Sequence, residues 1–423
     1  MQNSLMQKPE TIRVFGTAGS ATAYAIRDFL HRSLLPFEWI EVRSAGEIYT
    51  VHHLDCPRHL RLPICIFADG TCLENPTLAE ILDHIGWLVQ PTQRMYDLAI
   101  YGGGPAGLSA AVYGASEGLK TVLIERYAVG GQAGSSSRIE NYLGFPKGIS
   151  GADLAEKARE QACKFGAEIL MTREGVGAEF PDNHGVGILS DGTRIAARAA
   201  ICATGVHYRR LGIEGEERLI GAGVYYGAGS SEATLCQGEE VIVVGGGNSA
   251  GQAAMHFARY ACKVLMVIRG SGLKETLSDY LLQRITNAAN IEVLTQTVIS
   301  GVEGESTLRE VTLKNLASRD IRLVPTRWLF ICIGGEPQTE WASSVGILRD
   351  EAGYILTGPD LEFAKQNFAW PLHRAPYYLE SSVPGLFAAG DVRHGSVKRC
   401  ASAVGEGAMA VAFVHKHLAQ VPS

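Results

Sequence analysis

The chain has 423 residues, more than one ordinary domain core accommodates, so its length predicts roughly two to four domains. Hydrophobic residues make up 46% and charged residues 19%, a balance typical of globular and not of disordered proteins. The net charge of −6 gives no indication of nucleic-acid or anionic-membrane binding. The sequence contains neither a basic leader with an apolar core nor an apolar run long enough to span a bilayer. We therefore expect a cytoplasmic protein with no membrane partner.

Cysteine and histidine spacing gives no sign of a thiol pair or a metal centre. The nine cysteines are scattered, and no two are separated by the two residues expected of a vicinal redox pair or a zinc knuckle. Several lie in apolar segments, so we interpret most of them as buried small hydrophobes. The 12 histidines show no paired metal-ligand spacing, and we predict no metal site.

The N-terminal part of the chain has the pattern of a small α/β unit. Residues 12–42 predict a strand, a helix over 21–34 and a second strand. A third strand is led by Pro63, a hairpin turn follows at 69–70, and a closing helix begins near 75–76. The pattern predicts a compact unit that precedes the larger part of the chain.

This order of elements resembles the thioredoxin/glutaredoxin fold, with Pro63 where that family places its cis-proline. The family carries its redox pair at the end of the first strand, where this chain has Ser20 and Ala23 instead of cysteines. The resemblance therefore implies the fold without the thiol chemistry. Cys65, close to Pro63, could act as a lone thiol, but a buried strand residue is the favoured interpretation.

The stretch from residue 96 to residue 146 organises the rest of the chain. An apolar strand leads through three glycines into an Ala-rich helical run, and a second apolar strand ends in Glu125. In this pattern the first glycine, Gly102, makes the tight turn, the second lets the backbone approach a pyrophosphate, and the third packs helix on strand. The pyrophosphate then lies at the helix N-terminus, and an acid about 20 residues further on holds ribose hydroxyls. The stretch predicts a dinucleotide site.

A second unit of the same kind follows later in the chain. Gly245, Gly247 and Ala250 occupy the fingerprint positions between an apolar strand and an Ala-rich helix. The second strand of this unit is predicted to end at Arg269, the position where the first unit has Glu125. A guanidinium can pair with a phosphate that a carboxylate would repel, so we predict NADPH over NADH. The alternative is an exposed arginine at a strand end with no ligand.

Further segments resemble, residue by residue, the low-molecular-weight thioredoxin reductases. That family has GGQ and a following Asn at its isoalloxazine and ribityl chain, ATG at the end of a strand, GD near its C-terminus, and RxA opening the last helix. The same segments occur here in the same order, at residues 130–132, 141, 203–205, 390–391 and 399–401. The resemblance spans about residues 96–418. It implies that Asp391 binds the ribityl chain and that the last helix lies beside the flavin pyrimidine edge.

The resemblance also extends to the second unit and completes the set of candidate site residues. Lys274 matches the last basic residue of the family's HRRxxxR signature, whereas Ile268 and Gly270 replace its His and its second Arg. The residues expected to bind FAD are Gly102, Gly104, Pro105, Ala106, Gly107, Glu125, Gly131, Gln132, Asn141, Ala203, Thr204, Gly205, Gly390, Asp391, Arg399, Cys400 and Ala401. The residues expected to bind NADPH are Gly245, Gly247, Asn248, Ser249, Ala250, Arg269 and Lys274. No side chain is predicted to act as a general acid or base.

The redox pair of the thioredoxin reductases is missing from the sequence. The family carries a CATC-type pair just before its second glycine fingerprint, and this chain has GAGS there, at residues 227–230. A slip of one residue in the alignment does not restore two cysteines. Only Cys236 is near, and we interpret it as structural. Because disulfide reduction needs one thiolate to attack and another to resolve, the resemblance implies that this chain does not reduce thioredoxin.

We therefore predict an α/β protein with two Rossmann-like three-layer dinucleotide-binding domains preceded by a thioredoxin-like domain. The expected division is 1–90 for the thioredoxin/glutaredoxin-like domain, 95–208 and 335–423 for the two parts of the FAD-binding domain, and 209–334 for the NAD(P)H-binding domain. The placement of the first domain resembles the flavoprotein subunit of alkyl hydroperoxide reductase, in which an appended module relays electrons. A homodimer is expected from the family resemblance alone.

The favoured function is an FAD-dependent oxidoreductase that takes hydride from NADPH and passes electrons to an unidentified small-molecule or protein acceptor. Two alternatives stay open. A ferredoxin–NADP reductase-like enzyme of the same structural type also lacks the thiol pair. A flavin-based redox or nucleotide sensor without turnover is favoured by the loss of both thiol sites, whereas the retained Arg269 and Lys274 favour an active NADPH path.

Overall fold

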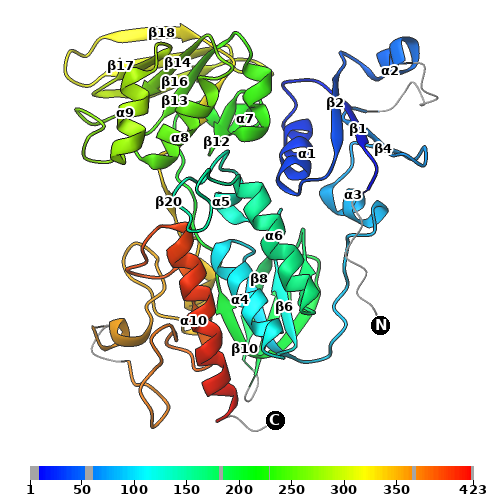
Figure 1. Ribbon diagram of the computed structural model, residues 1–423, viewed down its shortest axis with the longest axis vertical. Helices are drawn as coiled ribbons and strands as arrows, with labels where there is room; N and C mark the ends of the chain where they lie inside the picture. Colours follow the sequence, from blue (N-terminus) through cyan, green and yellow to red (C-terminus); the bar gives the residue numbers. More distant parts are fainter. Residues whose placement is uncertain (1–8, 53–60, 181–183, 228, 364–367, 421–423) are drawn as a thin grey trace.

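The chain forms three bodies, which Figure 1 shows in a computed structural model that describes residues 9–52, 61–180, 184–227, 229–363 and 368–420. The N-terminal unit is blue in Figure 1. The central unit contains cyan, green and red segments, and the outer unit is green and yellow. The chain leaves the central unit after β10, builds the outer unit, and returns to end in helix α10.

The N-terminal unit is a four-stranded mixed sheet in the order β2-β1-β3-β4. β1 pairs in parallel with β2 and antiparallel with β3, and β3 pairs antiparallel with β4. The peptide bond before Pro63 is cis. The expected elements are all present, although the first helix ends at Arg32 instead of residue 34 and the closing helix begins at Leu78 instead of near 75–76. The elements are β1 (Ile12–Gly16), α1 (Ala21–Arg32), β2 (Phe37–Glu41), α2 (Ala45–His52), β3 (Ile64–Ile66), β4 (Cys72–Glu74) and α3 (Leu78–His84).

The central unit is built on a sheet in the order β7-β6-β5-β10-β9-β8, with β21 pairing beside the second half of β10. The strands β7, β6, β5, β10 and β21 are parallel, and β8 and β9 add an antiparallel extension. Figure 1 shows α4, α6 and α10 running along this sheet. Its elements are β5 (Tyr96–Tyr101), α4 (Pro105–Ser116), β6 (Thr121–Ile124), α5 (Gly131–Gly134), α6 (Gly151–Lys164), β7 (Glu168–Leu170), β8 (Gly175–Glu179), β9 (Gly185–Leu189), β10 (Arg194–Cys202), η2 (Glu340–Val345), η3 (Gly358–Phe363), β21 (Leu386–Ala388), η4 (Gly390–Val392) and α10 (Cys400–Leu418).

The outer unit has a parallel five-stranded sheet in the order β12-β19-β13-β14-β15 and an antiparallel sheet β16-β17-β18. β14 ends at Val267, so Arg269 lies two residues beyond the strand and not at its end as expected. Its elements are α7 (Glu216–Leu219), β12 (Val224–Tyr226), η1 (Ser230–Cys236), β13 (Glu240–Val244), α8 (Asn248–Phe257), β14 (Lys263–Val267), α9 (Asp279–Asn287), β15 (Ile291–Leu294), β16 (Thr297–Glu303), β17 (Glu310–Asn315), β18 (Ile321–Pro325) and β19 (Leu329–Ile331).

Two features tie these bodies together. The short strands β11 (His207–Tyr208) and β20 (Gly335–Glu336) pair where the chain passes between the central and outer units. One continuous hydrophobic core contains Ile26 and Phe29 of α1 together with Leu98 and Leu108 of the central unit. Burial of apolar surface therefore stabilises the N-terminal unit against its neighbour as well as internally. No helix within the described ranges is long and apolar enough to cross a membrane.

Candidate functional site

The carboxyl ends of the parallel strands in the central unit meet at one edge of the sheet. Tyr101 at the end of β5 is opposite Ile124 at the end of β6 and Cys202 at the end of β10, and Cys202 is opposite Ala388 at the end of β21. The residues that follow these strands therefore come together, and they include the glycine turn, Glu125 and the 203–205 and 390–391 segments. Ligands of open α/β sheets bind at this edge.

The turn after β5 is closed by direct backbone packing. Gly102 has φ of +106°, and a Cβ there would collide with the carbonyl group of Ala203. A Cβ at Gly107 would collide with the carbonyl oxygen of Gly102, so helix and strand approach too closely for any side chain. Helix α4 begins at Pro105, and its N-cap residue, Gly104, makes no side-chain capping bond. The N–H groups of the first turn are thus left for an anionic ligand.

Glu125 is held rigidly beside that turn. One carboxylate oxygen accepts a hydrogen bond from the Gly103 N–H at 2.7 Å, and the other accepts one from the Tyr127 N–H at 2.9 Å. The residue is only 8% exposed. A carboxylate has about four acceptor positions, so two N–H donors leave room for ribose hydroxyls.

A cavity of about 770 Å³ opens beside Glu125. Its walls at this end include Gly102, Thr204 and His207, and it continues beneath β8 and β9. A volume of this size lies within the range of small-molecule and cofactor sites. The turn and the hydrogen-bonded Glu125 carboxylate fit the adenosine part of a dinucleotide, and the cavity extends beyond them along β8, β9 and residues 372–374 and 383–386.

The opposite end of the site is formed around Asp391. No protein group among the described residues donates a hydrogen bond to its carboxylate, and burial raises its pKa. Asp391 is half-buried, so its carboxylate is open on one side and can accept a hydrogen bond from a ligand hydroxyl. The Gly390 N–H donates to Glu406 at 2.7 Å, and Glu406 also pairs with Arg393 at 2.7 Å. Glu406 therefore fixes this turn; the sequence analysis missed it because it belongs to no recognised motif.

Helix α10 brings its N-terminus to the same place. A Cβ at Gly407 would collide with the carbonyl oxygen of Ala106, and the Ser109 hydroxyl donates to the carbonyl of Val404 at 2.7 Å. Helices α4 and α10 therefore pack closely near their N-terminal ends, beside which Arg399, Cys400 and Ala401 lie. Burial raises the pKa of Cys400 to about 11, so this thiol is protonated at neutral pH and is a poor nucleophile.

The loop at 130–132 faces the first glycine turn. A Cβ at Gly131 would lie 3.1 Å from the Cα of Gly104. The Gln132 side-chain amide donates to the Val206 carbonyl at 2.7 Å. Arg32 of the N-terminal unit donates to the Gly131 carbonyl at 2.7 Å. Asn141 is exposed, and the structure gives its side chain no role in fixing the loop.

The turn after β13 in the outer unit repeats the first. Gly245 has φ of +131°, and a Cβ there would collide with the Cys332 carbonyl oxygen. Helix α8 begins at Asn248 with Gly247 as N-cap. The Asn248 side-chain oxygen accepts from the Ser278 N–H at 2.8 Å and so holds the segment that leads into α9. Ser249 is exposed and Ala250 is buried, so of these two only Ser249 has its side chain open to solvent.

Two cationic side chains, Arg269 and Lys274, follow the second strand of this unit. Arg269 and Lys274 are exposed, and within the part of the chain that the structure describes neither takes part in an ion pair. Ile268, between β14 and Arg269, is 2% exposed and belongs to the hydrophobic core of the outer unit. The residue that replaces the family's His therefore packs inward and cannot face a ligand.

The segment at 227–230 leaves no room in its present backbone for a side chain at Gly227, the first of the two cysteine positions, and has Ser230 at the second. Gly227 and Gly229 both lie in the left-handed region, with φ of +94° and +54°. A Cβ at Gly227 would lie 2.5 Å from the Tyr208 hydroxyl, and one at Gly229 would collide with the Phe330 ring. Residue 228 lies outside the described residues. Cys236 is fully buried, and burial raises its pKa, which is consistent with the structural role predicted for it.

These two turns on two parallel sheets define a class: a Rossmann-type protein with sites for two dinucleotides. The family model described as pyridine nucleotide-disulphide oxidoreductase matches residues 96–407. A thioredoxin reductase from Listeria innocua is 33% identical over 331 residues, which make up 78% of this chain and 96% of that protein. The chain belongs to the pyridine nucleotide-disulphide oxidoreductase family.

Solved structures agree with this assignment. The thioredoxin reductase of Lactococcus lactis in its FR conformation is 30% identical, covers 77% of this chain and 100% of its own, and has a TM-score of 0.67. The thioredoxin reductase of T. acidophilum is 28% identical, covers 78% and 100%, and has a TM-score of 0.68. The predicted α/β class with Rossmann-like sheets is confirmed. The protein is an FAD-containing NAD(P)H oxidoreductase of the thioredoxin reductase-like class, which uses FAD and NADPH.

Proposed function

We propose that this protein takes reducing equivalents from NADPH and delivers them to an acceptor other than thioredoxin. The observation that carries the proposal is Gly227, where a thioredoxin reductase would have the first cysteine of its pair. A side chain there would press against Tyr208, and Cys236, the nearest cysteine in sequence, is buried with a raised pKa. A chain without an attacking and a resolving thiolate has no route to a protein disulfide.

The central unit is proposed to hold the FAD. The α4 N-terminus would bind the pyrophosphate, Glu125 the adenosine ribose and Asp391 the ribityl chain. The remaining FAD residues predicted from the sequence keep their proposed roles. When bound, FAD supplies hydride acceptance and electron transfer, and the protein supplies position and electrostatics. The positive end of the α10 dipole would favour negative charge at the flavin pyrimidine edge.

The outer unit is proposed to hold NADPH. The α8 N-terminus would receive the pyrophosphate, with Gly245 and Gly247 allowing the close approach. Arg269 and Lys274 are supported as partners of the 2′-phosphate because both are exposed cations with no competing carboxylate in the described ranges. Asn248 is supported as a positioning residue, since its side chain is already committed to the segment before α9.

The N-terminal unit is proposed to be a thioredoxin-like domain that has lost its thiol chemistry. Support comes from the sheet order β2-β1-β3-β4, with β1 and β2 parallel and the other pairs antiparallel. Ser20 accepts a hydrogen bond from the Ala23 N–H at 3.2 Å and serves as a helix cap. The domain divisions 1–90, 95–208, 209–334 and 335–423, the homodimer and the cytoplasmic location remain proposals on the grounds given with the sequence.

Anaerobic stopped-flow spectroscopy tests the proposed function. The purified protein is mixed with NADPH or NADH, and flavin bleaching is followed. We expect fast bleaching with NADPH and slower bleaching with NADH at equal concentration. Bleaching by neither nucleotide within minutes would contradict NADPH oxidation. In that case reduction of the flavin by reduced ferredoxin would support the ferredoxin–NADP reductase-like alternative, and no reduction by either donor would support a sensor.

A further inference from the structure

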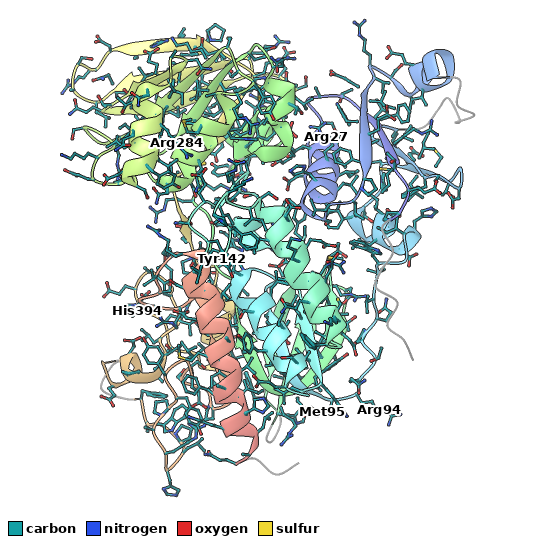
Figure 2. All side chains as sticks on the ribbon, viewed as in Figure 1. Arg27, Arg94, Met95, Tyr142, Arg284 and His394 are labelled. Carbon is teal, nitrogen blue, oxygen red and sulfur yellow. The ribbon has the colours of Figure 1, made fainter. Side chains whose placement is uncertain are left out.

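Helix α1 of the N-terminal unit lies beside the junction of the central and outer units, and Figure 2 shows Arg27 on this helix next to the outer unit. Residues three and four positions apart share one face of a helix, so α1 presents distinct faces to different partners. Ile26 and Leu30 belong to a core cluster with the strand residues Ile12 and Val14 of their own unit. The two remaining faces are buried against the rest of the chain.

One face of α1 is bound to the outer unit by a buried ion pair. The Arg27 guanidinium donates to both carboxylate oxygens of Glu232 in η1, at 3.1 and 3.0 Å. Their side chains are 2% and 0% exposed. One turn earlier, the Tyr24 ring packs on Tyr225 with centroids 4.9 Å apart. Because a buried charge without its partner is strongly unfavourable, this pair ties α1 to η1.

A second face of α1 is bound to the central unit. Arg32 donates to the Gly131 carbonyl at 2.7 Å, and the Tyr127 hydroxyl donates to the Ala25 carbonyl at 2.7 Å. Phe29 makes an edge contact with the same Tyr127 ring, with centroids 5.5 Å apart. Gly131 belongs to the loop that the proposed function places against the flavin. The N-terminal unit therefore contacts the 130–132 loop directly.

The loop between β1 and α1, which would carry the cysteines in a thioredoxin, also contacts the outer unit. A Cβ at Gly19 would collide with the side chain of Thr307 in the outer unit. A Cβ at Gly221 would lie 3.2 Å from the Ala21 Cβ at the start of α1. Docking therefore places the outer unit against this end of the N-terminal unit.

We propose that the N-terminal unit is an internal clamp: through α1 it holds the central and outer units in one orientation, and through Arg32 it positions the 130–132 loop. The part of the proposal that concerns the flavin rests on the proposed function. Arg32 is a positioning residue, since it acts through the Gly131 carbonyl. The clamp predicts that flavin reduction proceeds with the N-terminal unit docked and is slowed by its release.

Charge reversal at the buried ion pair releases the clamp. E232R places two cations together, and R27E/E232R restores the pair with its charges exchanged. Amide hydrogen exchange in α1 and at residues 130–132 should rise ~10-fold or more in E232R and return toward wild type in the double variant. D320R is a matched control, because Asp320 is an exposed acid in the turn between β17 and β18 of the outer unit. Unchanged exchange in E232R would overturn the proposal.

The same variants test the effect on turnover. With FAD content matched, the NADPH-driven bleaching rate of E232R should fall ~10-fold or more, because small misplacements of reacting groups have large rate costs. The double variant should recover to within a few-fold of wild type, and D320R should be unaffected. Fast exchange in α1 with an unchanged bleaching rate would overturn the positioning role.

A covalent lock covers the case in which E232R does not fold. G19C/T307C brings two thiols within disulfide reach, because a Cβ at Gly19 would lie 3.3 Å from the Thr307 Cβ, close to the separation of about 3.5–4.5 Å in a disulfide, and Gly19 does not have a left-handed φ. The oxidised, locked protein should bleach within ~2-fold of the same variant after reduction of the bond. Strong slowing by the lock would mean that the N-terminal unit must leave during turnover and would overturn the proposal. If the wild type is not bleached by NADPH, the proposed function fails, whereas the exchange experiment still decides whether the clamp exists.

Discussion

The two glycine turns share a backbone design and differ in the side chain that follows the second strand. Gly102 and Gly245 both have left-handed φ, and both lie against a carbonyl of the neighbouring strand. Glu125 is 8% exposed and accepts two backbone N–H groups, whereas Arg269 is exposed and has no ion pair within the described ranges. The comparison indicates that the turn supplies pyrophosphate recognition in both units, and that the charged residue soon after the second strand selects what binds beside it.

The largest expected effect is on FAD affinity and concerns the buried carboxylate of Glu125. Glu125→Ala should raise the Kd for FAD ~100-fold, because it removes charge-assisted bonds to the ribose and leaves the Gly103 N–H unpaired. Fluorescence titration of the deflavinated protein with FAD measures this. Glu174→Ala is the control, because Glu174 is an exposed acid in the wall of the same cavity. A Kd for the Glu125 variant as close to wild type as that of the control would refute the assigned role.

The next largest effect is on the KM for NADPH and concerns Arg269 of the outer unit. Arg269→Ala should raise the KM for NADPH ~10–30-fold and leave the KM for NADH nearly unchanged, since only NADPH carries the phosphate. Steady-state kinetics with both nucleotides separates the two cases. Arg319→Ala removes an exposed arginine elsewhere in the outer unit and should change neither KM. Equal losses with NADPH and NADH would mean that Arg269 does not read the phosphate.

A smaller effect is expected at Lys274, five residues further on. Lys274→Ala should raise the KM for NADPH ~3-fold, because an exposed lysine acts as a screened point charge. The effect should shrink as salt is raised from 20 to 200 mM, since screening grows. Lys314→Ala, on the outer antiparallel sheet, provides the control. A salt-independent effect would indicate a structural role instead.

The smallest effect concerns stability near the first turn. Burial and the neighbouring Arg126 lower the pKa of His207 to about 4, below its ordinary value of about 6.5. Between these values the unfolded chain binds the proton and the native state does not, so stability rises with pH across this window. His207→Gln should make that rise smaller by about 1 kcal/mol, after allowing for solvent screening. Urea unfolding at pH 4.5 and 6.5 measures it, and exposed His373→Gln should leave the rise unchanged.

The sequence predicted local features and missed contacts between distant segments. The turn at Gly102 and the acid at Glu125 belong to one short pattern, because strand, turn and helix are contiguous. Arg32 and Gly131 lie far apart in the chain, and Glu406 pairs with a turn in a different element. Such partners leave no periodic trace in a single sequence. The position of Arg269 depends on a similar packing contact. Ile268, the residue after β14, packs in the core of the outer unit, and Arg269 is the first exposed residue after the strand.

The central claim is that NADPH reduces the flavin and that the reduced enzyme does not pass electrons to thioredoxin. Sequential-mixing stopped flow tests both parts in one measurement: NADPH bleaches the flavin anaerobically, and the reduced protein is then mixed with oxidised thioredoxin. We predict rapid bleaching followed by no return of the oxidised flavin spectrum, because Gly227 and Ser230 occupy the two positions of the thiol pair. Rapid recovery of the oxidised spectrum on mixing with thioredoxin would contradict the account.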